Sequence, residues 1–191
     1  MKDFSHLLAK VNGRATASII RELLKMTSVP DMISFAGGMP APDLFPAEEI
    51  GEIVKDVIVK EPNIALQYGC TEGESGFKAE LIKLLKADED IEVTPDELIV
   101  TSASQQALDI VGKAFVDPGD AIIVGKPTYL GALQAFETYG ADMIGVESDD
   151  FGITAESLEE KLEALKKEGR VCKFIYIVPD FQNPTGTTIP T

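Results

Sequence analysis

Residues 121–146 read AIIVGKPTYLGALQAFETYGADMIGV, and this stretch decides the fold. It begins with a strand over residues 121–124, continues through a loop into a helix near residues 130–139, and ends in a second strand over residues 143–146. A helix that joins two strands in this way is typical of a crossover unit with parallel strands.

The same alternation continues on both sides of this stretch. Residues 98–101 and 105–115 predict a strand and a helix before it. Residues 155–168 predict a helix that stops at Gly169, and residues 171–178 predict a buried strand. Strands that alternate with helices of this length predict an α/β fold, with a mainly parallel sheet covered on both faces, hence three layers.

The N-terminal part follows another pattern. Helices are expected over about residues 18–26, along an amphipathic stripe at residues 50–58 and around residues 77–85, with a short strand at residues 32–35. Residues 94–97 form a capping-box pattern with Pro at the first helical position.

This change of character divides the chain into two parts. We expect an N-terminal arm with peripheral helices over residues 1–90 and the first part of a larger α/β domain over residues 91–191. The second part is expected to be incomplete, because it stops in a loop after its fourth predicted strand.

Composition restricts the classes of partner and compartment. The formal net charge is −15, so neither nucleic acid nor an anionic membrane is an expected partner. No apolar run has the length of a membrane span, which is about 18–20 residues. Cys70 and Cys172 are the only cysteines, so we expect a reduced, cytoplasmic protein.

Three loops at predicted strand ends could bind a ligand. Residues 101–106 (TSASQQ) either offer free backbone N–H groups to a phosphate or carboxylate, or use Ser102 or Ser104 as a simple helix cap. Tyr129 either presents its ring to a planar ligand or packs under a loop. The loop at residues 179–186 (PDFQNPTG) lies where α/β sheets bind ligands, yet by itself it signals only a turn.

Other common sites are not supported. The chain has no P-loop spacing, no G-x-G-x-x-G at the start of a helix and a single histidine, His6, so a zinc site or His-based triad is not expected. Ser75 and Lys78 form an S-x-x-K pattern, but Lys78 is expected on a solvated helix face.

Together, six motifs resemble the fold-type I pyridoxal-phosphate-dependent aminotransferases, in the class I/II branch that contains 2-aminoadipate aminotransferases. They are SFAGGMP (34–40), LQYG (66–69), TEG (71–73), ASQQALD (103–109), PTY (127–129) and QNPTG (182–186). The resemblance runs from about Arg14 to the last residue.

The resemblance implies a binding site for pyridoxal 5′-phosphate. Ala103, Ser104 and Gln105 match the phosphate-binding turn, where the family more usually has Gly in place of Ala103. Tyr129 matches the residue that stacks on the pyridine ring. Asn183 matches the asparagine that hydrogen-bonds the phenolic oxygen of the ring.

It also implies a homodimer with shared sites. Tyr68 matches a tyrosine that reaches the cofactor phosphate of the neighbouring subunit, and Gly37 and Gly38 match a loop that lines the substrate pocket.

One arginine has two interpretations. Arg21 matches a residue that in aminoadipate-type members can meet the distal carboxylate of the substrate, or it pairs on a helix surface with Glu22 or Asp31.

The family's Schiff-base lysine, the aspartate of the pyridinium nitrogen and the arginine of the α-carboxylate all follow the Asn-Pro-Thr-Gly motif. No residue of this chain matches them, so no catalytic residue is assigned. We expect the N-terminal part of an aminotransferase that moves an amino group between an amino acid and a 2-oxo acid. One alternative is a non-catalytic fragment or pseudo-enzyme that only binds ligand or dimerises, and another is a lyase or decarboxylase that uses the same cofactor.

Overall fold

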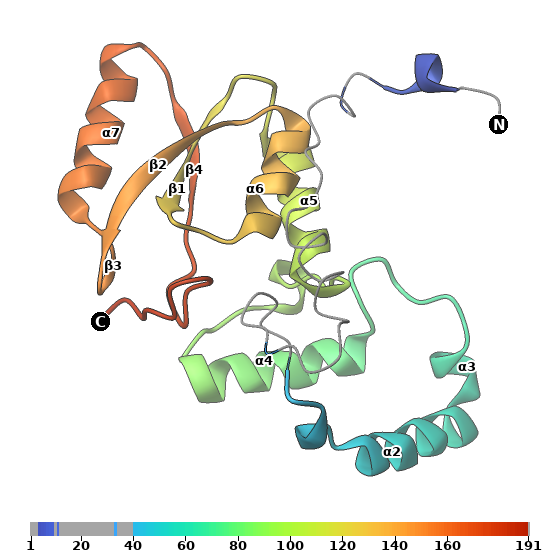
Figure 1. Cartoon of the computed structure of the whole chain (residues 1–191). Helices are drawn as coiled ribbons and strands as arrows, with labels where there is room; N and C mark the ends of the chain where they lie inside the picture. The colour runs from blue at the N-terminus through green and yellow to red at the C-terminus, as the bar shows by residue number, and fades with distance from the viewer. Residues whose placement is uncertain (1–3, 10, 12–32, 34–39, 191) are drawn as a thin grey trace. The chain divides into compact units, whose positions relative to one another are not determined.

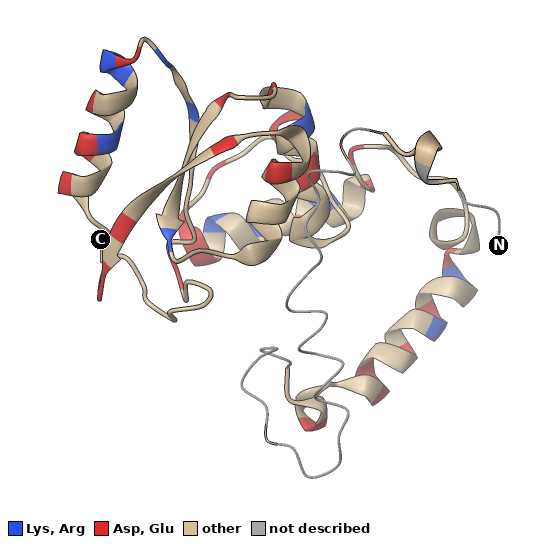
Figure 2. Ribbon diagram, turned by 45° about the horizontal axis from the view of Figure 1, so that its top comes forward, with Lys and Arg blue, Asp and Glu red and all other residues tan. Residues whose placement is uncertain are grey.

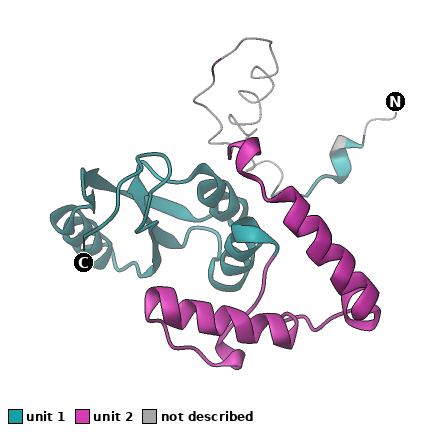
Figure 3. Ribbon diagram, turned by 90° about the horizontal axis from the view of Figure 1, so that it is seen from below, with its two compact units in different colours: residues 1–17, 102–191 teal, residues 18–101 magenta. Residues whose placement is uncertain are grey.

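The computed structural model describes residues 4–9, 11, 33 and 40–190 (Figure 1). Contacts group the chain into two units, residues 1–17 with 102–191 and residues 18–101, which Figure 3 shows in two colours. The domain division proposed from the sequence, residues 1–90 and 91–191, stays a prediction.

The unit that contains residues 102–191 alternates helices and strands as the sequence predicts. Its elements are η1 (Ser5–Leu7), α5 (Ala103–Phe115), β1 (Ala121–Lys126), α6 (Leu130–Tyr139), β2 (Asp142–Asp149), β3 (Gly152–Ile153), α7 (Ala155–Lys167) and β4 (Cys172–Tyr176). Helix α6 has the predicted bounds, because Gly140 follows it in the left-handed conformation, with φ +80°, that ends a helix.

The four described strands form one sheet in the order β3-β2-β1-β4. Strand β1 is parallel to both of its neighbours, with Ala121 opposite Asp142 in β2 and Cys172 in β4. The two-residue β3 is antiparallel to β2 and pairs Ile153 with Ser148. The predicted mainly parallel sheet is therefore confirmed, with a short antiparallel edge that the sequence did not predict.

Helices cover both faces of this sheet. On one face Ile122 and Val124 pack against Phe136 of α6. On the other face Ile123 packs against Leu165 of α7. Alternate residues of β1 thus enter two different cores, as expected for a parallel strand covered on both sides. Figure 1 shows the resulting layers, and Figure 2 shows acidic and basic residues together along α7.

Helices α5 and α6 approach each other closely at Gly112. A Cβ atom added there would lie 2.6 Å from Cδ2 of Tyr139, so no larger residue fits without movement. The Tyr139 hydroxyl also donates a hydrogen bond of 2.8 Å to Asp109 of α5. These contacts fix α5 against α6 along the face that covers the sheet.

The unit of residues 18–101 is helical in its described part. Its elements are η3 (Pro42–Leu44), α2 (Ala47–Lys60), α3 (Pro62–Ala65), α4 (Ser75–Glu89) and η4 (Pro95–Glu97). The Glu74 carboxylate caps α4 by accepting from the backbone N–H groups of Gly76 and Phe77, and these bonds lower the pKa of Glu74. The predicted capping box between Thr94 and Glu97 is confirmed, although it begins a 3-10 helix.

Helix α2 confirms the predicted amphipathic helix, and its apolar stripe stays accessible. Ile50, Ile53 and Val54 are 52%, 62% and 49% exposed. Across the part of the chain that the structure describes, no helix combines the length and the apolar character that crossing a membrane requires.

One strand prediction is wrong. Residues 98–101 form no strand, and the backbone N–H of Val100 instead donates to the carbonyl of Glu72 in a loop, at 3.0 Å. The Val100 side chain packs against Gly73, where a Cβ would lie 2.5 Å from Val100 Cγ2. Val100 therefore packs against a loop instead of a neighbouring strand, while Ile99 stays 52% exposed. The strand expected at residues 32–35 and the helix at 18–26 lie outside the described residues, apart from Ile33.

Candidate functional site

A pocket of about 400 Å³ lies beside the C-terminal ends of β1 and β4. It is lined by Ser104, Ala107, Leu108, Val111, Tyr129, Tyr176, Val178 and Asn183. Ala107, Leu108 and Val111 of α5 form an apolar wall, whereas Ser104 at the start of α5 and Asn183 contribute polar groups. Three residues assigned by resemblance, Ser104, Tyr129 and Asn183, therefore meet in one pocket.

The sheet topology explains this meeting. Tyr129 follows β1 and Asn183 follows β4, and the two strands are parallel neighbours. Their carboxyl ends therefore open at the same edge of the sheet, where α/β proteins bind ligands.

The first turn of α5 borders this pocket through Ser104. Ser104 and Gln105 are in the first turn, where backbone N–H groups have no acceptor within the helix. Within the described residues the N-cap, Ser102, makes no side-chain cap bond, and its own N–H donates to the side chain of Gln106. The structure therefore does not support the simple capping role for Ser102, and the first turn suits an anion.

The first residue of α5, Ala103, has a strained backbone conformation. Its φ is +60°, in the left-handed region that costs a residue with a Cβ roughly 1–2 kcal/mol. The family's more usual Gly adopts this conformation readily. Ala103 thus keeps the backbone path of the turn at a cost in stability.

Gln105 does not line the pocket. Its side-chain amide donates to the carbonyl of Gly131, at 3.2 Å, and so ties the start of α5 to the start of α6. In the structure the Gln105 side chain thus connects the two helices and is not part of the pocket wall.

Tyr129 is half-buried and packs against the core between the sheet and α6. A Cβ added at Gly131 would lie 2.5 Å from Tyr129 ring atoms, so the ring occupies the space beside residue 131. Tyr129 therefore both packs and faces the pocket, and the two interpretations made from the sequence are compatible.

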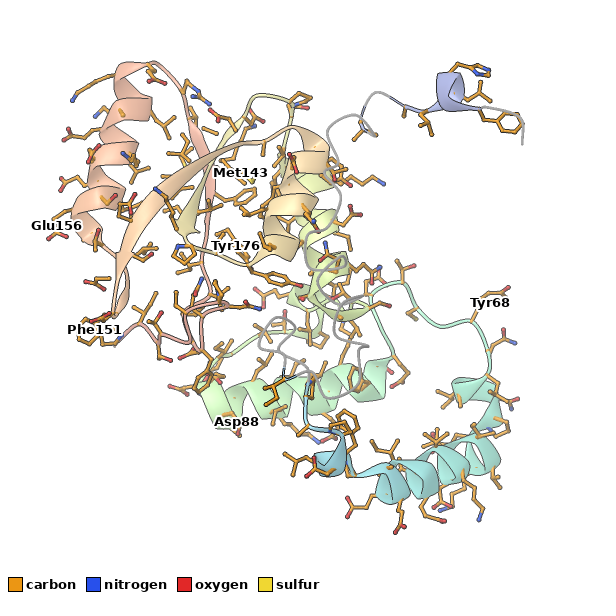
Figure 4. The ribbon with its side chains drawn as sticks, viewed as in Figure 1. Tyr68, Asp88, Met143, Phe151, Glu156 and Tyr176 are labelled. Atoms are coloured by element: carbon orange, nitrogen blue, oxygen red, sulfur yellow. The ribbon has the colours of Figure 1, made fainter. Side chains whose placement is uncertain are left out.

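Tyr176 is a pocket residue that the sequence reasoning missed. Its ring meets Phe136 edge-on, with centroids 5.7 Å apart, on the face of β4 that points to α6 (Figure 4). Burial, and to a smaller extent the electrostatic interaction with Tyr129, raise the pKa of the Tyr176 hydroxyl. The signal was present in the alternation of Phe174 and Tyr176, which places both rings on one face of the strand.

The loop that carries Asn183 is held by its own hydrogen bonds. The backbone N–H of Gln182 donates to the carbonyl of Thr187, at 2.8 Å, and the N–H of Ile189 donates to that of Pro179, also at 2.8 Å. Asn183 itself is exposed and lines the pocket.

The remaining predicted site residues are not brought to this pocket by the described structure. Tyr68 belongs to the other unit and is 99% exposed. Arg21, Gly37 and Gly38 lie outside the described residues.

The expectation for Lys78 is wrong. Lys78 is 8% exposed, whereas the neighbouring Phe77 is 52% exposed. Its aliphatic stem lies near Gly73, where an added Cβ would be 3.6 Å from Lys78 Cδ, beside a pocket of about 760 Å³ in the unit of residues 18–101. Lysine can bury its stem in this way while the ammonium group reaches a polar opening.

Comparison with known proteins shows which sequences this chain is similar to. The chain is 48% identical over 173 residues to aromatic-amino-acid aminotransferase 1 of Thermococcus litoralis, covering 91% of this chain and 42% of that protein. It is 43% identical to 2-aminoadipate transaminase of Thermus thermophilus, covering 98% of this chain and 44% of that protein.

A solved structure gives the same result for the fold. The α-aminoadipate aminotransferase of Thermus thermophilus, complexed with N-(5′-phosphopyridoxyl)-L-leucine, matches with a TM-score of 0.84 and 39% identity, over 99% of this chain and 44% of that chain. The chain thus spans less than half the length of these relatives. The model of the family "Aminotransferase class I and II" matches residues 31–191. The chain belongs to this family of aminotransferases.

Proposed function

We propose that this chain is part of an enzyme that moves an amino group between an amino acid and a 2-oxo acid, and that it binds pyridoxal 5′-phosphate in the pocket between α5, β1 and β4. Members of the family are pyridoxal-phosphate-dependent aminotransferases. The observation that supports cofactor binding by this chain is the meeting of Ser104, Tyr129 and Asn183 in one pocket.

The residues present fit the three chemical parts of the cofactor. The first-turn N–H groups of Ser104 and Gln105, with the positive end of the helix dipole, suit the phosphate. The ring of Tyr129 offers a flat face to the pyridine ring. The side-chain amide of Asn183 can donate a hydrogen bond to the phenolic oxygen.

When bound, the cofactor supplies an electron sink for the carbon that loses or gains the amino group. The groups of this chain hold it in place rather than transfer protons. Apolar residues of α5, such as Ala107 and Val111, line the pocket and would limit the access of water to a bound cofactor. Burial raises the pKa of Tyr176 above its ordinary value and so favours its neutral hydroxyl.

Other residues of the chain would complete the site. Tyr68, fully accessible in this chain, would reach the phosphate in the other subunit of a homodimer. Gly37 and Gly38 would line the substrate pocket, and Arg21 would bind a distal carboxylate of the substrate. The free thiols of Cys70 and Cys172 are consistent with the cytoplasmic location that we infer.

Binding of pyridoxamine 5′-phosphate tests the proposal directly, because this form needs no bond to a lysine. We expect saturable binding in isothermal titration. Asn183→Ala should weaken it about tenfold or more, since a hydrogen bond to a charged oxygen is worth roughly 1.5–3 kcal/mol. Asn63→Ala, an exposed asparagine in α3, is the matched control and should leave the affinity unchanged. Equal affinities for the wild type and Asn183→Ala would contradict the proposed site.

Amino transfer itself is tested with the full-length protein that carries this sequence. Conversion of 2-oxoglutarate to glutamate with a panel of amino acids, including 2-aminoadipate and aromatic amino acids, should show which donor is used. Arg21→Gln should raise KM for an acidic donor and leave that for an aromatic donor unchanged. Pure protein that binds the cofactor but transfers no amino group from any donor would favour the non-catalytic alternative.

A further inference from the structure

Two loops carry the cofactor groups of the proposed site, and the strands alone do not fix their spacing. Strands β1 and β4 pair as far as Val124 and Tyr176. Tyr129 and Asn183 both lie beyond this last pair, in segments outside the strand ladder. Another contact is needed to hold the ring of one residue at a constant distance from the amide of the other.

The side chain of Gln182 makes that contact. Its Nε2 donates to the backbone carbonyl of Pro127, at 3.0 Å. Pro127 is two residues before Tyr129, and Gln182 is directly before Asn183. This single hydrogen bond therefore joins the loop that carries Tyr129 to the loop that carries Asn183.

The orientation of the Gln182 amide is fixed by its other partners. Its Oε1 accepts from the backbone N–H of Thr185, at 2.8 Å, and from the Thr185 hydroxyl, at 2.6 Å. An amide turned the other way would set its NH₂ group against an N–H donor and its oxygen against the Pro127 carbonyl. These contacts therefore orient Nε2 of Gln182 toward the carbonyl of Pro127.

Main-chain bonds make the residue a rigid base for this contact. The N–H of Gln182 donates to the Thr187 carbonyl at 2.8 Å, and its own carbonyl accepts from the N–H of Gly186. Gln182 is partly buried, so water competes less for its amide than at the exposed Asn183.

We propose that Gln182 is a positioning residue that sets the Asn183 amide relative to the Tyr129 ring and so adjusts affinity for the cofactor ring. The inference rests on the proposed function, because it acts through the same pocket. Gln182 touches no cofactor atom in this scheme. Its effect reaches the ligand through Asn183 and Tyr129.

A double-mutant cycle with pyridoxamine 5′-phosphate tests this, using the intact protein. Gln182→Met keeps the length and removes both polar ends. We expect a loss of affinity of about three- to tenfold in the wild-type background, the range for one neutral hydrogen bond. In the Asn183→Ala background the same change should cost less than about twofold, because the group being positioned is gone.

Two controls separate positioning from general loss of structure. Gln134→Met changes the same residue type in α6 of the same unit and should leave affinity unchanged. Inorganic phosphate, which needs only the α5 N-terminus, should compete equally well in the wild type and Gln182→Met, whereas a general loss of structure would weaken binding of both ligands.

The outcomes distinguish this inference from the proposed function. If the wild type binds pyridoxamine 5′-phosphate and Gln182→Met weakens it equally in both backgrounds, or not at all, the role of Gln182 is refuted and the site stands. If the wild type binds no pyridoxamine 5′-phosphate, the proposed function fails for this protein and the role of Gln182 fails with it.

Discussion

Replacing Ala103 with Gly should stabilise the protein, although glycine normally weakens a helix. Ala103 has a φ of +60°, in the left-handed region where a Cβ costs roughly 1–2 kcal/mol. Glycine removes that cost but gives the unfolded chain more freedom, which offsets about 0.4–1 kcal/mol. The net gain expected is about 0.5–1 kcal/mol.

Urea denaturation measures this difference. With a slope of about 2 kcal/mol per M, the midpoint should rise by roughly 0.3–0.5 M at unchanged slope. The matched control is Ala114→Gly, an exposed residue of the same helix that has no positive φ. There glycine should lower stability by about 0.5–1 kcal/mol. The same substitution is thus expected to have opposite signs at two positions of α5.

A fall of the urea midpoint in both variants would refute this reasoning. If Ala103→Gly and Ala114→Gly both lower the midpoint, the first residue of α5 stores no strain. A rise at Ala103 would instead explain why the family more usually has glycine at this position. Phosphate binding should change little, because glycine keeps the backbone N–H.

Three further predictions concern packing and titration. Gly112→Ala should cost about 1–3 kcal/mol in denaturant titrations, since its Cβ would lie 2.6 Å from a carbon of the Tyr139 ring. Tyr139→Phe should lose about 0.5–1.5 kcal/mol at neutral pH through the lost bond to Asp109. The same hydrogen bond, with burial, raises the pKa of Tyr139. Its contribution to the free energy of unfolding is therefore present below the unfolded pKa of about 10 and is lost as pH rises through the folded pKa. Thermal melts of Tyr139→Phe should lack this loss of stability at alkaline pH. Glu97→Gln should remove a contribution that is present above the unfolded pKa of about 4.3 and is lost as pH falls, because the bond from the Thr94 N–H lowers the pKa of Glu97. Thermal midpoints of the wild type and Glu97→Gln that differ by the same amount at pH 3 and at pH 7 would contradict this last expectation.

Much of the sheet unit could be predicted because its signals are local. Helix α6 is delimited by Gly140, whose left-handed conformation ends it, and β1 is marked by a short β-branched run. Strand β3 has two residues and no pattern of its own, so it depends on the neighbouring β2 for its existence. Residues 98–101 have the composition of a strand, but in the described structure Val100 bonds to a loop, and composition carries no information about that partner.

The site could be predicted only where a motif carried it. Asn183 and Tyr129 were assigned by resemblance, and the structure brings them to one pocket. Gln182 was quoted in the same motif without a role, because its partner Pro127 is 55 residues away and no local pattern predicts that hydrogen bond. Lys78 was misassigned since helix periodicity cannot tell which residues another loop will cover.

The position of β4 explains why some residues of this site could be assigned from the sequence and others could not. Strand β4 follows β2 and β3 in the chain, yet it pairs with β1 on the other side, so the loop after β1 meets the loop after β4. Had β4 paired with β2 instead, on the side away from β1, Tyr129 and Asn183 would lie about one strand spacing further apart, roughly 5 Å. Strand order therefore sets the distance between the Tyr129 ring and the Asn183 amide to within one strand spacing. A hydrogen bond such as that from Gln182 can then fix it to within a few tenths of an ångström, which is the precision that a directional bond to the cofactor requires.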